Sequence, residues 1–200
     1  MIKGYKGLNE NMVATHGNWM QYEIGKWYEI DGKIEPCCHG FHFCKTIEDV
    51  TRFYPLLGNT RLFEVEADGE MIDIGEKVVC SRIRLIREVP QQEILSYAKN
   101  AILAFRECSS FCFGWACEYI ARNYNHTDMP KKYKKKISIF QTLEVPYLVL
   151  TGLFAIGVFS GMEAIGIAMF FCSPLVLIFF QMKCEKIIVK WIREQRDFNK

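Results

Sequence analysis

The chain has 200 residues, of which 50% are hydrophobic and 24% are charged, and its formal net charge is +2. This length allows one ordinary domain with a modest extension. A net charge this small excludes the strongly basic balance of most nucleic-acid-binding proteins, so we expect no nucleic-acid partner. The cysteine count of 9 is odd and the cysteines are scattered along the chain, which argues against a disulfide framework.

Residues 1–90 have the pattern of a strand-rich cytosolic domain. Residues 1–8 predict a short strand, and residues 20–30 predict a broken strand pair, which a strong turn signal at Asp31-Gly32 follows. The segment GFHFC over residues 40–44 predicts the next strand.

A short helix is expected after that strand. Thr46 has a side chain suited to an N-cap, and Glu48 and Asp49 would lie in the first turn, where carboxylates interact favourably with the helix dipole. Pro55 marks the end of this helix.

Residues 61–67 predict a further strand, and residues 77–89 predict a long last strand or a strand pair. In the first of these, Phe63, Val65 and Ala67 alternate with glutamates, so we expect them to point into the core. The order of three strands, one helix and two strands predicts an α+β fold with a small mixed or antiparallel sheet. The chain has no glycine-rich phosphate loop, G-x-S-x-G or H-E-x-x-H motif.

Residues 91–124 predict helices, and residues 125–144 predict a polar linker that contains a lysine run. An apolar stripe at helical spacing and an apolar segment over residues 111–121 indicate two helices, which pack on the domain or on a membrane surface. The stripe consists of Ile94, Leu95, Ala98, Ile102 and Phe105.

Residues 145–162 and 164–182 are two apolar tracts, which Glu163 separates. At 1.5 Å per residue each tract would extend about 27–29 Å, close to the hydrocarbon thickness of a bilayer. We therefore expect a C-terminal hairpin of two transmembrane helices, the alternative being a buried hairpin of a soluble protein. Gly157 and Gly161 have the spacing of a helix-packing pair, through which the hairpin would also form a homo-oligomer.

Basic residues flank the expected hairpin on both sides, and the turn between its two helices has none. This distribution predicts an integral protein of a bacterial inner membrane or a host cell membrane, with both termini in the cytosol. Residues 183–200 predict an amphipathic tail that lies along the lipid bilayer, with Trp191 at the level of the headgroups. The bilayer is thus the first expected partner.

Cysteine and histidine residues cluster between positions 37 and 44. A zinc site usually needs a second pair of ligands elsewhere, and strand alternation would turn His42 and Cys44 to one side and Phe41 and Phe43 to the other. We therefore expect neither a metal ion nor another cofactor.

Several segments together resemble a family of uncharacterised domains found mainly in bacteriophages and prophage-bearing bacteria. The resemblance covers roughly residues 1–89, and GFHFC is its most specific part. It implies no activity and does not include the hairpin. The segments are GYKGL, YEIGKWYEIDGKI, CHGFHFCKTIEDVTRFYP, RLFEVEADG and KVVCSRIRLIREV.

GYKGL and GFHFCKTIEDV are also similar, more distantly, to the first two motifs of the ADP-ribosyltransferase fold. This resemblance implies that Lys6 takes the place of the first-motif histidine or arginine, and that Lys6, His42 and Tyr54 line a pocket for a nucleotide-like ligand. If the domain were active, its catalytic residues would be Lys6, His42 and Glu76. The last strand lacks the catalytic glutamate of that fold, so we expect no catalytic residue and no such activity.

Three hypotheses for the function follow. The leading one is a membrane-tethered, non-enzymatic binding or regulatory protein of phage type, whose cytosolic domain recognises a nucleotide-like ligand or a protein partner. The second is a two-span effector of the abortive-infection kind that perturbs the membrane. The third is an active mono-ADP-ribosyltransferase, which would require acid chemistry at Glu76.

Overall fold

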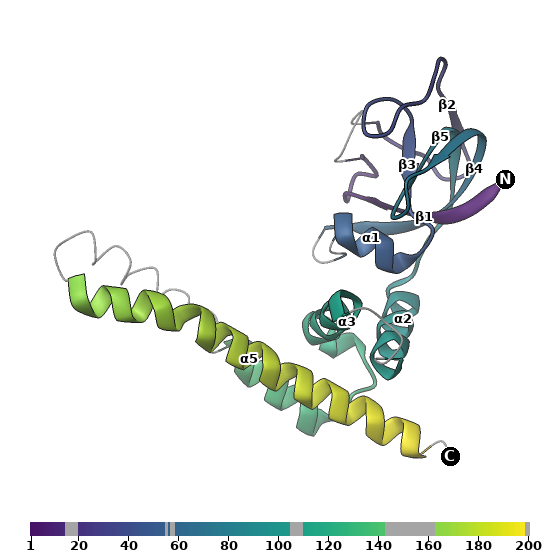
Figure 1. The fold of residues 1–200 in the computed structure, drawn as a ribbon. Helices are drawn as coiled ribbons and strands as arrows, with labels where there is room; N and C mark the ends of the chain where they lie inside the picture. The colour runs from purple at the N-terminus through teal and green to yellow at the C-terminus, as the bar shows by residue number, and fades with distance from the viewer. Residues whose placement is uncertain (15–19, 55, 57–58, 105–109, 143–162, 199–200) are drawn as a thin grey trace. The chain divides into compact units, whose positions relative to one another are not determined.

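The computed structural model describes residues 1–14, 20–54, 56, 59–104, 110–142 and 163–198. The chain divides into two compact units, an N-terminal unit (Met1–Ile94) and a C-terminal unit (Leu95–Lys200). Figure 1 shows a sheet in the N-terminal unit and helices in the C-terminal unit. The N-terminal unit has an α+β fold with an antiparallel sheet, one of the two sheet types that the sequence predicted.

A long antiparallel hairpin of β4 (Arg61–Asp73) and β5 (Val78–Glu88) is the centre of the N-terminal unit. On its outer face Glu66 of β4 lies opposite Arg84 of β5 and accepts a 2.6 Å hydrogen bond from the guanidinium. Its inner face carries the alternating apolar residues that the sequence indicated. The inward residues of β4, all fully buried, are Phe63, Val65 and Ala67.

The other strands pair with this hairpin. β1 (Ile2–Leu8) pairs with β4 along its whole length. Two three-residue strands share the free edge of β5: β3 (Phe41–Phe43) lies beside its first residues and β2 (Trp27–Glu29) lies further along. The sheet order is β1-β4-β5-β2, and β3 pairs with β5 off this path.

The expected strand pair over residues 20–30 is reduced to β2. Gln21 instead forms an isolated antiparallel bridge with Val13, and Ile24 forms a parallel bridge with Leu85. The residues before Gly25 therefore pair singly with other segments of the chain and not with the residues that follow them.

A single bridge closes the sheet into a small ring. The backbone N–H of Tyr5 donates to the carbonyl of Cys44 at 2.7 Å, and the N–H of Cys44 donates to the carbonyl of Tyr5 at 2.8 Å. Because Cys44 directly follows β3, this bridge joins β1 to β3, so that β1, β4, β5 and β3 enclose one hydrophobic core. The core residues include Leu8, Ala14, Tyr22, Phe41, Phe43, Phe63, Val65, Ala67, Val78, Cys80, Ile83 and Leu85.

Helix α1 (Ile47–Phe53) begins as the sequence predicted. The hydroxyl of Thr46 accepts a 3.1 Å hydrogen bond from the backbone N–H of Asp49, which caps the first turn. Glu48 and Asp49 lie in that turn, and the helix buries Val50 toward the sheet. This local capping places α1 beside β1 (Figure 1).

The C-terminal unit consists of helices. α2 (Gln91–Leu103) begins in the last residues of the N-terminal unit and continues into this one, and α3 (Ser110–Arg122) follows it, as expected from residues 91–124. A short 3-10 helix, η1 (Tyr124–His126), a helix over residues 131–142 and the long α5 (Glu163–Phe198) complete the unit. The stripe predicted on α2 is buried at Ile94, Leu95, Ala98 and Ile102, whereas Phe105 lies outside the described residues.

Asp128 connects two of these helices. One carboxylate oxygen accepts a 2.6 Å hydrogen bond from the ammonium of Lys99 on α2, and the other accepts a 3.0 Å hydrogen bond from the amide of Gln195 on α5. The Lys99 ammonium also lies 4.8 Å from the ring centroid of Trp191 on α5. These contacts order the C-terminal half of α5 within its unit.

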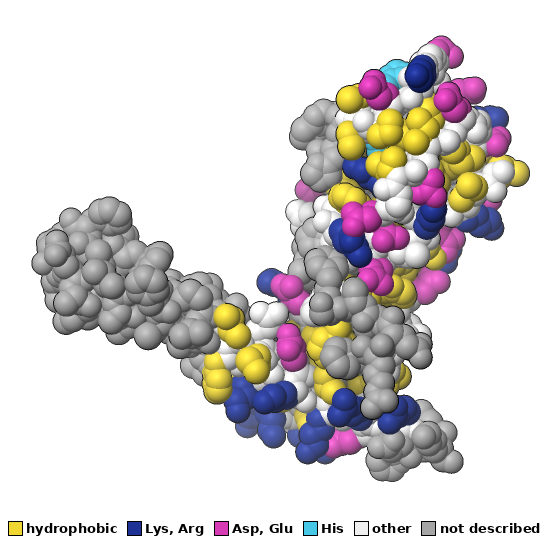
Figure 2. Space-filling model, viewed as in Figure 1, with side chains coloured by type: hydrophobic (Ala, Val, Ile, Leu, Met, Phe, Trp, Pro, Cys, Tyr) yellow, Lys and Arg dark blue, Asp and Glu magenta, His cyan; other side chains and the backbone are white. Residues whose placement is uncertain are grey.

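Lysine and arginine side chains gather on the C-terminal unit, as Figure 2 shows. They come from the helix over residues 131–142 and from the second half of α5. The exposed ones are Lys131, Lys132, Lys135, Lys136, Lys183, Lys186, Lys190, Arg193 and Arg196.

The predicted transmembrane hairpin over residues 145–182 is wrong, because among the described residues no helix is long and apolar enough to cross a membrane. The tract 164–182 is part of one 36-residue helix, α5, which continues through the predicted surface tail. The end of α5 packs against protein: Trp191, expected among lipid headgroups, is 1% exposed. The tract 145–162, with Gly157 and Gly161, lies outside the described residues.

Three further predictions depended on the hairpin and are wrong for the same reason. They are an integral membrane location with both termini cytosolic, a membrane tether for the N-terminal domain, and a two-span effector that perturbs the membrane. The sequence reasoning correctly identified an apolar face on residues 183–200, but it assigned lipid to that face where the structure has the other helices of the C-terminal unit.

Candidate ligand-binding site

A cavity of about 270 Å³ opens in the N-terminal unit between β1, the segment around β3, and α1. Lys6, His42 and Tyr54, the three residues predicted to contact a ligand, all line it. Most of the remaining wall is apolar, and no acidic side chain lines the cavity in the described part of the chain. The other lining residues are Tyr5, Gly7, Cys37, Phe43, Cys44, Val50, Phe53 and Lys77.

Two glycines of β1 make this arrangement possible. A Cβ atom on Gly4 would lie 2.4 Å from the carbonyl oxygen of Cys44, and one on Gly7 would lie 2.5 Å from Cγ of Tyr54. Any side chain at either position would therefore push β1 away from Cys44 or from Tyr54. The segment GYKGL thus holds Lys6 at the cavity because its two glycines allow close approach on both sides.

Lys6 is a buried cation. Its side chain is 7% exposed, and its Nζ donates a 2.6 Å hydrogen bond to the backbone carbonyl of His42 and lies 5.3 Å from the ring centroid of Tyr22. In the part of the chain that the structure describes, no carboxylate forms an ion pair with it. Burial, which disfavours the charged form, lowers the pKa of Lys6 to about 8.

His42 binds the backbone of Cys37, another residue that lines the cavity. Its Nε2 accepts a 3.0 Å hydrogen bond from the backbone N–H of Cys37, which assigns the ring proton of the neutral form to Nδ1. Burial, and then the charges of Lys6 and Lys77, lower the pKa of His42 to about 4. The imidazole is therefore neutral at neutral pH, and Nε2 is already occupied as an acceptor.

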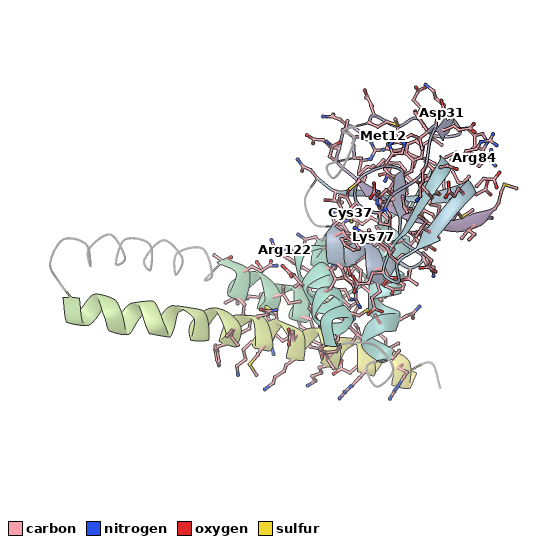
Figure 3. The ribbon with its side chains drawn as sticks, turned by 45° about the horizontal axis from the view of Figure 1, so that its top comes forward. Met12, Asp31, Cys37, Lys77, Arg84 and Arg122 are labelled. Carbon is pink, nitrogen blue, oxygen red and sulfur yellow. The ribbon has the colours of Figure 1, made fainter. Side chains whose placement is uncertain are left out.

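Lys77 supplies a second cation at the cavity. Its Nζ donates to the Sγ of Cys37 at 3.3 Å and lies 5.1 Å from the ring centroid of Phe53. Figure 3 shows Cys37 and Lys77 next to each other. Cys37 has a φ of 64°, in the left-handed region that non-glycine residues rarely adopt. Within the described residues Lys77, like Lys6, has no carboxylate partner.

Glu76 does not belong to this group. It is not a lining residue, and its carboxylate forms an ion pair with Arg52 of α1. Of the three residues named for an active ADP-ribosyltransferase, the structure brings Lys6 and His42 together and engages Glu76 elsewhere. Among the residues that the structure describes, the carboxylate that this chemistry requires is therefore not placed at the cavity.

Sequence reasoning missed Cys37, Phe53 and Lys77. Phe53 lies three residues after Val50 on α1, a spacing that places both on one helix face and that the sequence does show. Lys77 reaches the cavity from the turn before β5, and Cys37 reaches it through its left-handed backbone conformation. A single sequence shows neither feature.

The cysteine and histidine cluster is divided between surface and interior. Cys37 and Cys38 are exposed, whereas Cys44 is buried, and burial raises the pKa of the Cys44 thiol to about 11. Among the residues that the structure describes, no three His, Cys, Asp or Glu side chains form a group able to hold a metal ion.

The comparison with curated proteins and the comparison with solved structures found no match. The phage association and the ADP-ribosyltransferase-like fold therefore gain no support from them. A comparison with family models confirms the coarser prediction, that of an uncharacterised domain in the N-terminal part of the chain. Residues 2–97, which contain the whole sheet, α1 and the cavity, match the family described as Domain of unknown function (DUF7666).

Proposed function

We propose that the N-terminal unit is a binding domain for a small organic anion with a flat apolar part, which occupies the cavity beside Lys6. One observation carries the proposal. Two lysines, Lys6 and Lys77, line a cavity with mostly apolar walls, and neither has a carboxylate partner among the described residues.

The cost of burying an unpaired ammonium supports an anionic ligand. A charge removed from water without a counter-charge destabilises the folded state, and the lowered pKa of Lys6 reflects that cost. The neighbouring thiol does not compensate, because burial raises the pKa of Cys44 to about 11 and leaves it neutral. A bound carboxylate or phosphate would supply the missing negative charge.

The aromatic walls support a flat ligand body. Phe53 and Tyr54 line the cavity from α1 and the residue after it, and such rings favour stacking or edge contacts with planar groups. The nucleotide-like ligand predicted from the sequence belongs to this class, with its base against the rings and its phosphate at the lysines. The second predicted partner, a protein, stays a prediction.

A binding role fits the groups at the cavity better than hydrolysis or group transfer. The Nε2 of His42 accepts the N–H of Cys37, and Glu76 pairs with Arg52, so the residues best suited to acid–base catalysis are engaged in structural contacts.

Calorimetric titration of the full chain tests this proposal with matched pairs of ligands. Benzoate and adenosine monophosphate should bind, whereas their neutral counterparts, benzamide and adenosine, should bind at least about tenfold more weakly. Lys6→Met and Lys77→Met should each weaken binding of the anions by about tenfold or more. Lys45→Met is the control, because Lys45 pairs with Asp73 and does not line the cavity. Equal binding of charged and neutral ligands, or unchanged binding by both variants, would overturn the proposal.

A further inference from the structure

We infer that Lys6 is a nucleophilic amine that forms a reversible imine with an aldehyde or ketone group of the bound anion. This inference rests on the proposed binding function and names the reactive group of its ligand. The ligand class is then a planar carbonyl compound that also carries a carboxylate or a phosphate.

The surroundings of Lys6 differ from those of the structural lysines in this chain. Lys26, Lys45 and Lys99 each pair with a carboxylate. Lys6 instead donates one N–H to the His42 carbonyl and lies beside the Tyr22 ring, and neither of these partners carries a negative charge that would hold the lysine in its ammonium form. Lys6 is also one of the residues that line the cavity, so a ligand bound there lies beside it.

A substantial fraction of Lys6 carries a free lone pair at neutral pH. With its pKa lowered to about 8, about one molecule in ten has a neutral amine at pH 7, whereas an ordinary lysine has fewer than about one in a thousand. The thiols next to Lys6 do not restore the ammonium, because burial raises the pKa of Cys44 to about 11 and that of Cys80 to about 12. Lysines desolvated in this way are the ones that serve as imine-forming nucleophiles.

The reaction needs no reagent besides the ligand. The lone pair of the neutral Nζ attacks the carbonyl carbon, and the C=O π pair moves to the oxygen. The two hydrogens of the amine transfer to that oxygen, which leaves as water, and a C=N bond remains. Addition of water reverses every step. The Lys77 ammonium would hold the anionic end of the ligand, because it lines the same cavity and has no carboxylate partner in the described residues.

Two probes with the same shape separate this inference from the binding function. 4-Formylbenzoate carries a planar ring, a carboxylate and an aldehyde, and 4-(hydroxymethyl)benzoate replaces the aldehyde by an alcohol. The full chain is incubated with 4-formylbenzoate and cyanoborohydride, which traps imines, and the modified residue is identified by peptide mass spectrometry. We expect one adduct, on Lys6, formed at a rate that rises with pH with a midpoint near 8, and protection by excess 4-(hydroxymethyl)benzoate.

Substitutions of three lysines test the separate roles of Lys6 and Lys77. Lys6→Arg keeps a cation, so it should retain binding of 4-(hydroxymethyl)benzoate and lose the adduct. Lys77→Met should slow adduct formation about tenfold through weaker binding of the carboxylate, and Lys45→Met should leave it unchanged. If 4-(hydroxymethyl)benzoate binds and 4-formylbenzoate gives no adduct on Lys6, or adducts spread over surface lysines, the imine is wrong and the binding function stands. If neither probe binds, both proposals fail.

Discussion

The ring of Tyr54 lies against the backbone of Gly7, so close that a Cβ atom on the glycine would be 2.5 Å from the ring Cγ. Tyr54 follows the last residue of α1, and Gly7 lies next to Lys6 on β1. This contact joins two walls of the cavity, and it exists only because position 7 has no side chain.

Gly7→Ala should therefore destabilise the N-terminal unit by about 1–3 kcal/mol, the usual cost of forcing an extra carbon into a packed site. Urea unfolding followed by circular dichroism measures this change. Gly114→Ala in α3 is the control: no atom lies within 4 Å of the added carbon, and alanine favours a helix interior over glycine by about 0.5–1 kcal/mol. Tyr54→Ala should restore part of the stability lost in Gly7→Ala, and a Gly7→Ala variant as stable as the wild type would show that the contact is not close.

Lys6→Met should make the chain more stable at pH 7. The lowering of the pKa of Lys6 from 10.5 to about 8 corresponds to about 3 kcal/mol of destabilisation by the buried charge. Loss of the hydrogen bond to the His42 carbonyl offsets about 1 kcal/mol of this, which leaves a net gain of about 1–2 kcal/mol.

The stability contributed by Lys6 depends on pH. Between pH 8 and 10.5 the unfolded chain binds the proton of this lysine more tightly than the folded chain does, so wild-type stability contributed by Lys6 rises with pH in that window. The advantage of Lys6→Met over the wild type should shrink across the same window. An advantage that is absent at pH 7, or that grows between pH 8 and 10.5, would contradict a buried unpaired ammonium.

His42 should make the chain sensitive to mild acid. Its pKa is lowered from 6.5 to about 4 in the folded chain, so the unfolded chain takes up a proton first as the pH falls. The stability contributed by neutral His42 is therefore complete above about pH 6.5 and is lost between pH 6.5 and 4. Denaturation at a series of pH values should show the wild type losing stability relative to His42→Gln in this window. Above pH 7 the difference between the two proteins should be constant, and a constant difference down to pH 4 would refute the shift.

Trp191→Ala should destabilise the C-terminal unit by about 3–5 kcal/mol, because the indole is 1% exposed and packs among the helices of that unit. The neighbouring Lys190→Ala removes an exposed side chain and should change stability by less than about 0.5 kcal/mol. Thermal unfolding followed by circular dichroism compares the two. Equal melting temperatures would indicate that Trp191 is not covered by protein.

Local signals predicted the N-terminal unit well. The alternation of Phe63, Val65 and Ala67 and the capping side chain of Thr46 act over a few residues, and each produced the expected element. The pairing of β3 and β2 with one edge of β5 was beyond such signals, because register between distant segments depends on the whole core.

The predicted lipid-facing tail over residues 183–200 failed for a different physical reason. An apolar tract shows that a helix must be removed from water, but hydropathy alone does not distinguish lipid from protein as its cover. The apolar face at Ile188, Trp191 and Ile192 was visible in the sequence, and only the structure shows which helices bury it. For the cavity, Lys6, His42 and Tyr54 followed from the family resemblances of the segments that contain them, whereas Lys77 reaches the cavity from the turn between β4 and β5, and nothing in a single sequence shows that this turn lies there.

The sheet pairings also set an order of events during synthesis of the chain. β1 has its partner in β4, so it finds its ladder only after residues 61–73 have left the ribosome, and β2 and β3 find theirs in β5 only after residues 78–88 have done so. The hairpin of β4 and β5 is the only long pairing between sequence neighbours in the described sheet, which makes it the natural nucleus. The nascent segment before Arg61, with its exposed phenylalanines and cysteines, must therefore remain unpaired through most of the translation of this domain, the interval in which a chaperone would have most effect.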